Sequence, residues 1–522
     1  MSQMLKSSAA MAGATLTSRI LGMVREMVYA RFMGDGWVAG AFQVAFTMPN
    51  LFRRLLGEGA LTAAFIPIFK EKEKTGPPAE MWRAANAVIS GMIVACAVII
   101  GLVLLGVSLA LAFGDFEAKT HLMLSLLRVM FPYMLLVCLT AVFMGMLNAR
   151  GHFFIPALGA TLLNVVLIAS VIFLAPRMGR ELHEQIYALA LGVLVAGVAQ
   201  AAFQLPSLRG EGFRYAWVTP WRDPTVQRTV RQMIPGTIGV AAFHINVVII
   251  QNLGLWLDTP QSPVIAPFNY AVRLMELPQG VFGISVATYL LPTLAGLAAE
   301  KDFAAFRVNL RQALSHLLLV NLLAAVLLVL LAEPIIRLLF EGRRFGPDAT
   351  LRAAWALQCL APSLLAYSWV NILARAFFAL GDTKTPMKIS VVCLGINLVL
   401  AVGLAQWFRQ GGLGMANTLS SALNCGLLFY ALRRKLKTLE LAPLRASLAG
   451  LAAAGFAAGV VTWMIGSTWE QALGHGTVVL QLGAVFVPAG AAALVYGVIA
   501  WICRVPAITE LTDWALARLR RR

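Results

Sequence analysis

The sequence predicts an all-α polytopic membrane protein with about 14 transmembrane helices, built as two pseudo-symmetric six-helix lobes followed by two C-terminal helices. Three observations support this fold class. Of the 522 residues, 59% are apolar and only 13% are charged, whereas soluble proteins carry about 25% charged residues. Apolar runs of about 20 residues recur along the whole chain, the length that a helix needs to cross a bilayer. Prolines and glycines also recur at a nearly constant spacing, which indicates an internal duplication.

Each predicted helix corresponds to one apolar segment. Two of these segments, at 37–69 and 264–297, contain internal prolines and glycines. They therefore predict broken helices of the kind that line transport pathways. The six cysteines fall inside the predicted helices without CxxC spacing, which favours small core residues over disulfides or metal ligands. The predicted segments are approximately 8–31, 37–69, 84–113, 121–147, 156–175, 185–205, 231–257, 264–297, 308–332, 353–380, 388–407, 412–432, 446–466 and 478–503.

The internal repeat sets the predicted domain organisation. Its period covers six helices, an even number, so both copies enter the membrane from the same side, as parallel repeats do. We expect an N-lobe at 1–208, a C-lobe at 209–437, and a C-terminal pair of helices with a basic tail at 438–522. The landmarks 230 residues apart are Pro132 and Pro362, Gly151 and Gly381, and Pro156 and Pro386; Pro49 and Pro278 are 229 residues apart.

The net charge of +18 arises mainly from loops between the apolar segments. This distribution argues against nucleic-acid binding and follows the positive-inside rule. Basic residues collect at 70–74, 209–228, 433–437 and 518–522. These loops lie on one side if the N-terminus is inside, so both termini are predicted to be cytoplasmic. The loop 333–352 is an exception, because it carries four arginines on the predicted outer side.

Charged residues at bilayer depth are the strongest functional signal in the sequence. Each costs roughly 2.5–3.5 kcal/mol on insertion scales, so it normally faces a hydrated cavity or a partner. On the first helix, Thr15, Arg19, Gly22 and Glu26 recur at three- and four-residue steps and share one face. Arginines outnumber acids in the spans, which implies a hydrated cavity that receives an anion. The span charges are Arg19, Arg25, Arg53, Arg54, Arg128, Arg273, Arg375, Glu26, Glu58 and Glu276.

The kind of basic residue in the spans indicates the chemical class of the substrate. All the basic residues in this set are arginines, and a guanidinium group grips phosphate with two parallel hydrogen bonds. The predicted substrate is therefore anionic and bears phosphate or diphosphate. A second interpretation remains open: these arginines extend to the interface or pair with the acids. It is favoured for Arg54, Arg128 and Arg375. Arg273 and Glu276, three residues apart, would also pair on a helix, although pairing does not exclude substrate contact.

Other candidate sites are weaker. His244 and His316 lack metal-type neighbours one helical turn away, so no metal site is predicted. Asn164 and Asn397, in apolar spans, predict hydrogen bonds between helices. No GxxxxGK[ST] sequence and no nucleophile–base pattern occur, which indicates a transporter and not an enzyme. We expect no cofactor; transport would be coupled to the membrane potential, a monovalent cation or the substrate gradient.

Four segments carry a resemblance to a known family: "SRILGMVRE", "MPNLFRRLLGEGALTAAFIPIF", "YAVRLMELPQGVFG" and "GDTKTPMKI". With these segments the chain resembles the MurJ (MviN) family of lipid II flippases, in the multidrug/oligosaccharidyl-lipid/polysaccharide exporter superfamily. The resemblance implies two lobes in a V shape, with a groove for the lipid tail at the last two helices. It also implies a role in peptidoglycan and cell-wall biogenesis and in cell shape. The activity would be flipping of lipid II, an undecaprenyl-diphosphate-linked precursor, from the inner to the outer leaflet of the bacterial cytoplasmic membrane.

The resemblance also implies site residues, and membrane lipids as the other partners. Gly40 stands where many family members carry Asp, which puts a carboxylate role there in doubt. Alternatives are an exporter of another polyprenyl-linked oligosaccharide, of O-antigen type, and an ion-coupled multidrug antiporter, which would show an excess of acids. The family's central-cavity residues correspond to Ser18, Arg19, Arg25, Arg53, Arg273 and Glu276. Hinges for alternating access are expected at Pro49, Gly57, Gly59, Pro278, Gly280 and Gly283.

Overall fold

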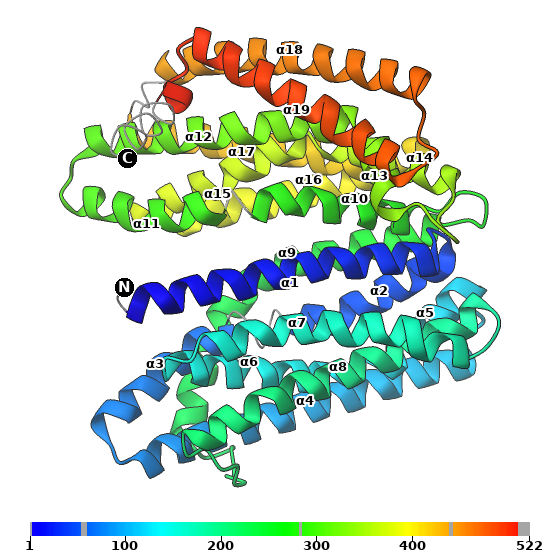
Figure 1. Ribbon diagram of the computed structural model, residues 1–522. Coiled ribbons are helices and arrows are strands. Elements are labelled where there is room, and N and C mark those ends of the chain that lie inside the picture. The colour runs from blue at the N-terminus through cyan, green and yellow to red at the C-terminus, as the bar shows by residue number, and fades with distance from the viewer. Residues whose placement is uncertain (1–2, 54–59, 281–283, 438–441, 510–522) are drawn as a thin grey trace. The chain divides into compact units, whose positions relative to one another are not determined.

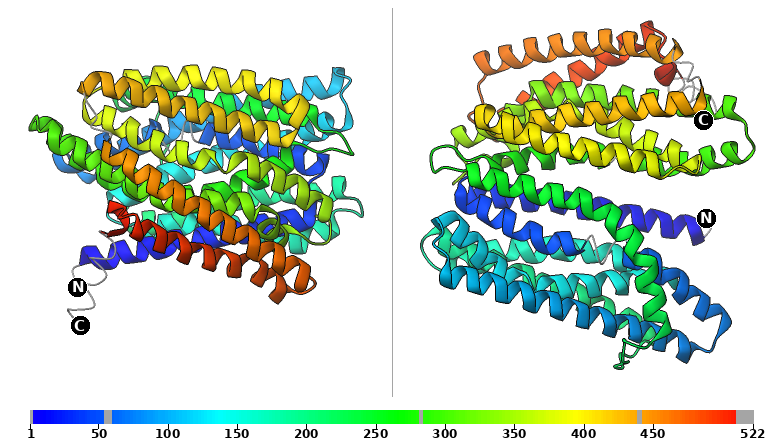
Figure 2. Two further views of the ribbon diagram at one scale, coloured as in Figure 1. Left: turned by 90° about the horizontal axis from the view of Figure 1, so that it is seen from above. Right: turned by 180° about the vertical axis from the view of Figure 1, so that it is seen from behind.

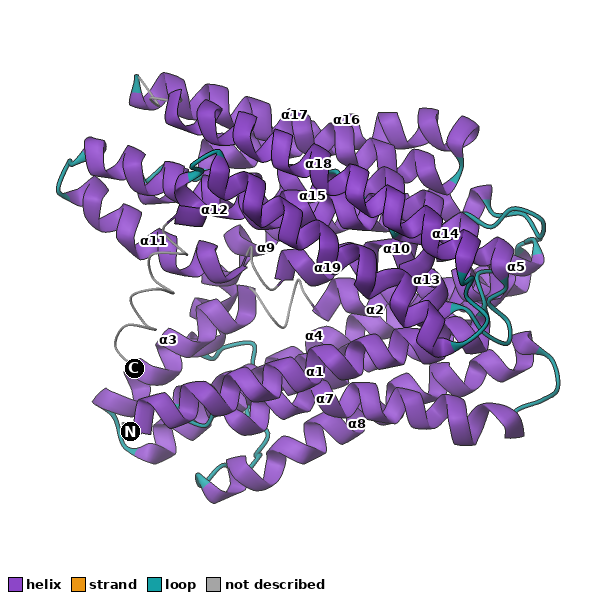
Figure 3. Cartoon of the chain, turned by 45° about the horizontal axis from the view of Figure 1, so that its top comes forward, coloured by secondary structure: helices purple, strands orange, loops and turns teal. Residues whose placement is uncertain are grey.

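The computed structural model describes residues 3–53, 60–280, 284–437 and 442–509 (Figure 1). All the secondary-structure elements assigned in these ranges are helices, which Figure 3 colours purple. The predicted all-α class is therefore confirmed. Contacts divide the chain into two compact units: unit 1 is Met1–Ser262 with Gly342–Arg344, and unit 2 is Pro263–Glu341 with Phe345–Arg522.

Unit 1 contains the helices that carry most of the predicted site. The helix α7 continues into a π-helical turn and a 3-10 turn, Ser170–Leu174 and Ala175–Arg177. The helices of unit 1 are α1 (Gln3–Met33), α2 (Trp37–Phe52), α3 (Ala60–Thr75), α4 (Pro78–Phe113), α5 (Ala118–Met130), α6 (Tyr133–Ala149), α7 (Phe154–Ala169), α8 (Leu182–Gly210) and α9 (Pro224–Leu257).

Unit 2 repeats this order and adds elements of its own. The short helix α13 has no predicted counterpart, because it lies in the loop at 333–352. The helices of unit 2 are α10 (Ile265–Pro278), α11 (Ile284–Ala299), α12 (Phe303–Leu330), α13 (Ala332–Phe340), α14 (Pro347–Leu360), α15 (Ser363–Ala379), α16 (Lys384–Phe408), α17 (Gln410–Leu436), α18 (Ala442–Ala472) and α19 (Val478–Ile502).

Each of the fourteen predicted segments contains one helix or two consecutive helices. By length and hydropathy alone, seven helices of the described residues are able to cross a membrane, or nine if each of two bent pairs counts as one span. Three of the other five segments fall short for evident reasons. The helix α1 carries Arg19, Arg25, Glu26 and Arg31, which lower its hydropathy. The segments at 37–69 and 264–297 lie partly outside the described residues, and the helices described in them, α2, α3, α10 and α11, are each shorter than a span.

The internal repeat is visible in the backbone. The pair α5–α6 bends by 45° next to Pro132, and the pair α14–α15 bends by 42° next to Pro362. Proline breaks a helix because it lacks an N–H and its ring clashes with the preceding turn. The duplicated landmarks predicted from the sequence are thus confirmed at both bends.

The duplicated glycines end equivalent helices in the same way. Gly151 has φ +88° and Gly381 has φ +74°, left-handed values that a glycine adopts without strain. The next residue in each repeat donates its N–H back to the helix: His152 to the Leu147 carbonyl and Asp382 to the Phe377 carbonyl, both at 2.9 Å. This is the Schellman arrangement that terminates helices.

A side-chain contact to a carboxylate lies beside each of these turns. In unit 1, His152 Nε2 lies 2.7 Å from a carboxylate oxygen of Glu211, just beyond the end of α8. In unit 2, Lys435 Nζ, in the last turn of α17, lies 2.7 Å from a carboxylate oxygen of Asp382. The acid therefore follows the packed helix in unit 1 and follows the glycine in unit 2.

Helices pack in matching pairs inside the two units. In unit 1, α2 packs on α5, and both α6 and α7 pack on α8. In unit 2, α10 packs on α14, and both α15 and α16 pack on α17. The core of unit 2 includes the fully buried Phe306 and Phe377, and burial of each phenylalanine side chain contributes about 1.5–3 kcal/mol.

The unit boundary lies after Ser262 because α9 packs on α2, α3 and α4. The predicted lobes at 1–208 and 209–437 were based on the repeat, a different property from compactness, so that division stays a prediction. The final hairpin, α18 and α19, packs on α12 (Figure 2). Tyr496 on α19 donates a hydrogen bond to the Leu319 carbonyl at 2.8 Å.

Candidate functional site

The predicted substrate-binding residues fall on three helix segments. Ser18, Arg19 and Arg25 lie on α1, and Arg53 directly follows α2, all in unit 1. Arg273 and Glu276 lie on α10 in unit 2. The predicted site residues therefore form one group of side chains in unit 1 and another in unit 2.

Arg25 is the centre of the group on α1. Its Nη1 donates a hydrogen bond to Oδ1 of Asn164 on α7 at 3.1 Å, and its Nη2 pairs with the carboxylate of Glu26. Its guanidinium carbon lies 5.5 Å from the centre of the Tyr29 ring, within cation–π range. The Arg25 and Glu26 side chains are only 14% and 11% exposed. A buried guanidinium group is thus neutralised and oriented by three neighbours.

Asn164 on α7 makes hydrogen bonds to two residues of α1. Besides accepting from Arg25, its Nδ2 donates to the backbone carbonyl of Ser18 at 3.2 Å. Ser18 and Arg25 are seven residues apart and share one helix face. Between them, an ideal Cβ on Gly22 would lie 3.8 Å from Asn164 Nδ2, an ordinary van der Waals distance, so α1 and α7 are close here without a steric demand for glycine. The predicted hydrogen bonding of Asn164 between helices is confirmed.

One hydrogen-bond donor of the Arg25 side chain is unused. Its Nε–H group is buried and has no hydrogen-bond partner among the described residues. A buried donor without an acceptor costs about 1–3 kcal/mol. An acceptor atom supplied by a ligand would remove that cost. The Nη1 and Nη2 groups of Arg25 make the contacts to Asn164 and Glu26, so the Nε–H is the group that such an acceptor would bind.

The other two predicted arginines of unit 1 are Arg19 on α1 and Arg53 at the end of α2. Arg19 follows Ser18, so it points about 100° around α1 from the face that meets Asn164. Arg19 and Arg53 are both half-buried. Arg53 caps α2, and its backbone N–H donates to the Pro49 and Asn50 carbonyls. Their role in substrate binding stays a prediction.

The group in unit 2 is an exposed ion pair. Arg273 Nη1 lies 2.9 Å from a carboxylate oxygen of Glu276, and the two side chains are 46% and 47% exposed. The alternative that these residues pair is therefore what the structure contains. Exposed pairs of this kind contribute only about 0.2–1 kcal/mol to stability, and the role of both residues in substrate binding stays a prediction.

Three of the six predicted hinge residues are described by the structure. Pro49 lies inside α2 and is buried, three residues before the helix ends at Phe52. Pro278 is the last residue of α10, and Gly280 lies two residues beyond it. Gly57, Gly59 and Gly283 lie outside the described residues, as do Arg54 and Glu58. The hinge role stays a prediction at all six positions.

A salt-bridge network accounts for the loop at 333–352, which departs from the positive-inside pattern. Arg337, 10% exposed, pairs with Glu333, with Glu341 at 3.8 Å and with Glu470 at 2.5 Å. Arg344 in the same loop donates hydrogen bonds to the Phe32 carbonyl and to Gln185 Oε1. The three glutamates neutralise the charge of Arg337, and Arg344 donates its hydrogen bonds to neutral acceptors. The loop therefore presents less positive charge than its four arginines suggest.

Acidic and histidine side chains do not gather into a metal centre in the described part of the chain: no group of three or more His, Cys, Asp or Glu there could hold a metal ion. Coupling to a monovalent cation stays a prediction.

Comparison with known proteins places these groups in context. A family model described as lipid II flippase MurJ matches residues 29–483. A probable lipid II flippase MurJ of Rhizobium tropici is 33% identical over 477 residues, covering 90% of this chain and 88% of the relative. The lipid II flippase MurJ of Burkholderia cenocepacia is 33% identical over 434 residues, covering 81% of this chain and 82% of the relative.

Solved structures support the fold independently. A lipid II flippase MurJ in an inward closed conformation matches with a TM-score of 0.74 at 21% identity, covering 94% of this chain and 98% of that chain. An inward-facing multidrug resistance transporter of the MATE family matches with a TM-score of 0.64 at 15% identity, covering 81% and 96%. These similarities extend the fold assignment to nearly the whole chain.

Proposed function

This chain belongs to the MurJ family of lipid II flippases, and we propose that it carries lipid II from the inner to the outer leaflet of the bacterial cytoplasmic membrane by alternating access. The observation that carries the proposal is the family match over residues 29–483. The excess of intramembrane arginines supports the same conclusion. An anionic diphosphate cargo balances charges that are otherwise costly in a bilayer.

Cargo binding begins, in this proposal, at the exposed pair on α10. A diphosphate oxygen replaces the Glu276 carboxylate on Arg273, because the pair is weak and reachable. Arg25 contributes through the edge that Glu26 and Asn164 leave open. Ser18, Arg19 and Arg53 complete the head-group contacts. Guanidinium groups suit this role because they hold phosphate with two parallel hydrogen bonds.

Conformational change follows from charge neutralisation. The bound diphosphate cancels the positive field of the arginines, which permits the two repeats to move about the interruptions next to Pro49 and Pro278. After release, the membrane potential acts on the empty, positive site. One charge moved through 100 mV is worth about 2.3 kcal/mol, enough to bias the return step. A monovalent cation is the second possible source of energy.

The remaining assignments complete the proposal. The protein acts as a flippase without catalytic chemistry and without a cofactor, and its partners are lipid II and the surrounding lipids. Both termini lie in the cytoplasm, because the basic loops at 70–74, 209–228 and 433–437 then face inward.

Two experiments test this function. Depletion of the protein in its own host should cause lipid II to accumulate in the inner leaflet. Purified protein in liposomes should then move labelled lipid II and leave an O-antigen-type polyprenyl diphosphate unmoved. Equal movement of both lipids would replace lipid II with a broader polyprenyl cargo, and movement of neither would refute the flippase assignment.

A further inference from the structure

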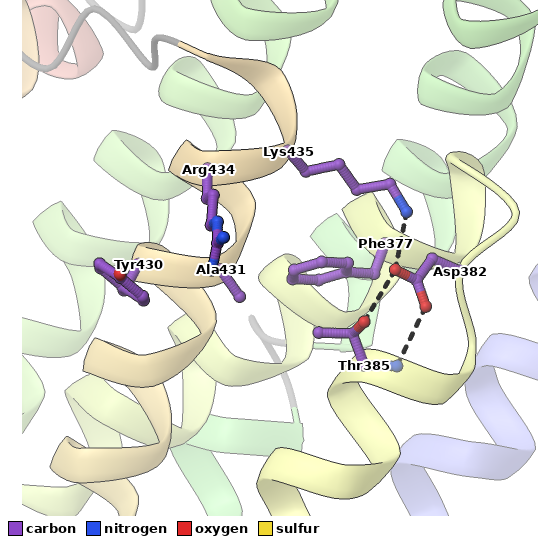
Figure 4. Close-up of a pocket in the computed structure, with 7 residues that line it drawn as sticks. All are labelled: Phe377, Asp382, Thr385, Tyr430, Ala431, Arg434 and Lys435. Carbon is purple, nitrogen blue, oxygen red and sulfur yellow. Dashed lines mark hydrogen bonds and ion pairs between the residues drawn. The ribbon is translucent and has the colours of Figure 1, made fainter.

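Unit 2 contains a pocket with charged and apolar lining residues that does not include the predicted cargo residues. It lies where α15 ends, α16 begins and α17 ends, and its volume is about 290 Å³ (Figure 4). Small-molecule sites typically occupy about 300–1,000 Å³, so this pocket has room for a phosphate with a few carbon atoms and not for a disaccharide-peptide. The lining residues are Phe377, Asp382, Thr385, Tyr430, Ala431, Arg434 and Lys435.

One cation of the pocket is already paired. Lys435 Nζ donates to Asp382 Oδ2 at 2.7 Å, and Thr385 donates its backbone N–H to Oδ1 at 3.0 Å and its hydroxyl to Oδ2 at 2.9 Å. The Lys435 hydrogen bond, together with those from Thr385, lowers the pKa of Asp382 to about 2. Asp382 therefore stays charged and fixes Lys435 at the pocket wall.

Arg434 is the cation that remains. It is exposed, and it has no ion-pair or hydrogen-bond partner among the described residues. In Figure 4 its guanidinium group lies between Tyr430 and Phe377, whereas Lys435 extends across to Asp382. The Asp382 carboxylate already accepts hydrogen bonds from the first turn of α16 and from Lys435. The guanidinium group of Arg434 is thus the charge that the pocket presents to an incoming anion.

The surroundings indicate where that anion comes from. Tyr430 is 67% exposed one turn before Arg434, and exposed tyrosines concentrate at the level of lipid head groups. The last turn of α17 carries Arg433, Arg434 and Lys435, and basic pockets between helix ends on the cytoplasmic side bind anionic lipid head groups. The pocket therefore opens at head-group depth and not in the hydrocarbon core.

We propose that this pocket binds the phosphodiester head group of an anionic phospholipid, with Arg434 as the phosphate ligand, Lys435 as the supporting charge and Tyr430 against the glycerol and upper acyl chain. Assignment to the inner leaflet rests on the proposed orientation of the chain; the binding itself does not. The site is distinct from the cargo residues, so its test is independent of flipping.

Photo-crosslinking in vesicles tests the proposal. The full-length protein is reconstituted in phosphatidylcholine containing a minor fraction of phosphatidylglycerol and a trace of photoactivatable phosphatidylglycerol. After irradiation, a chymotryptic digest locates the adducts. We expect adducts on the segment that includes Tyr430 and Lys435, and few when the photoactivatable lipid is phosphatidylcholine. Equal labelling by the two lipids would overturn the proposal.

A matched pair of variants identifies the ligand residue. Arg434→Gln should lower phosphatidylglycerol adducts by about threefold or more, the effect of losing one partly exposed charged contact. Arg433→Gln removes the same charge one residue away, outside the pocket lining, and should leave the yield within about 1.5-fold of wild type. Equal losses in both variants would show general charge attraction and would overturn the assignment to the pocket.

A competition experiment separates a lipid from a soluble anion. Excess inorganic phosphate should leave the adduct yield unchanged if the lipid head group is the ligand. Displacement of the lipid by phosphate would identify a soluble phosphate site and overturn the lipid assignment. Thermal unfolding and size-exclusion profiles of each variant confirm that the comparison is made between folded proteins.

Discussion

Arg25 on α1 donates a hydrogen bond to Asn164 on α7 at 3.1 Å, across 139 residues of sequence. The same asparagine holds the Ser18 carbonyl. One uncharged side chain therefore positions the two ends of the segment that carries three of the predicted cargo residues. This relationship makes Asn164 a positioning residue, and it leads to the first prediction.

Replacement of Asn164 by Leu should lower the free energy of unfolding by about 1–3 kcal/mol, because Arg25 and the Ser18 carbonyl lose their partner in a buried setting. Thermal unfolding in detergent measures the effect. Asn397→Leu is the matched control: its hydrogen bond to Asn417 is longer, at 3.4 Å, and no charge is involved. Equal shifts in the two variants would contradict the special role of Asn164.

Arg273→Gln should reduce lipid II movement in liposomes by about tenfold or more, the effect of losing one charge-assisted phosphate contact of about 1.5–3 kcal/mol. The free energy of unfolding of Arg273→Gln should change by less than about 1 kcal/mol, because the pair with Glu276 is half exposed. Glu276→Gln should keep transport, since it frees the guanidinium group. Arg128→Gln, a predicted interfacial residue, is the control. Normal transport by Arg273→Gln would remove Arg273 from the site.

Arg337→Gln should destabilise unit 2 by about 1–3 kcal/mol. The change leaves the Glu333, Glu341 and Glu470 carboxylates without their shared cation, and the cost is below the 3–5 kcal/mol of a fully buried pair because the glutamates are partly exposed. Arg343→Gln removes an exposed arginine from the same loop and should have little effect. Thermal unfolding distinguishes them; similar values would mean that the network adds nothing.

The lowered pKa of Asp382 predicts how the stability of the protein depends on pH. Its folded pKa of about 2 lies below the ordinary value of 3.8, so its contribution to stability is complete above the ordinary pKa and is lost as the pH falls through the folded value. In Lys435→Gln the folded pKa should rise toward the ordinary value, so the contribution that Asp382 loses on acidification becomes smaller. Unfolding temperatures recorded from about pH 7 to pH 3 should therefore start lower for this variant and fall less than those of the wild type. Parallel curves would contradict the pairing.

Gly151→Ala and Gly381→Ala should each cost about 1–2 kcal/mol, because both positions require a left-handed backbone. No heavy atom lies within 4 Å of an added Cβ at either position, so the cost is conformational and not steric. Gly101→Ala, within α4 and with equal space around it, should instead be neutral or stabilising. A neutral Gly151→Ala would contradict the left-handed turn.

Much of the fold is predictable from periodic and local signals. Runs of apolar residues predict α4, α8 and α12, and Pro132 with Pro362 predicts the two bends, because proline acts on its own turn. The offset between Gly151 and Gly381 predicts equivalent helix ends. Asn164 is predictable as an interhelical contact, because an amide in an apolar span needs a partner.

Partner identity is not predictable in the same way. Sequence spacing places Arg25 on a face but does not reveal that Asn164, on another helix, accepts from it. The neutralisation of Arg337 depends partly on Glu470, 133 residues away, so the loop charge misleads until the fold is known. The short helix α13 and the packing of α9 in unit 1 are likewise decided by tertiary contacts and not by hydropathy.

The two duplicated turns place the carboxylate on opposite sides of the contact, which has a consequence for grafting. If the segment around His152 were transplanted onto the segment around Asp382, an imidazole would meet the ammonium group of Lys435, and in the reciprocal graft a carboxylate would meet the carboxylate of Glu211. At this turn, each segment therefore suits the helix end in its own repeat and would lose its contact in the other.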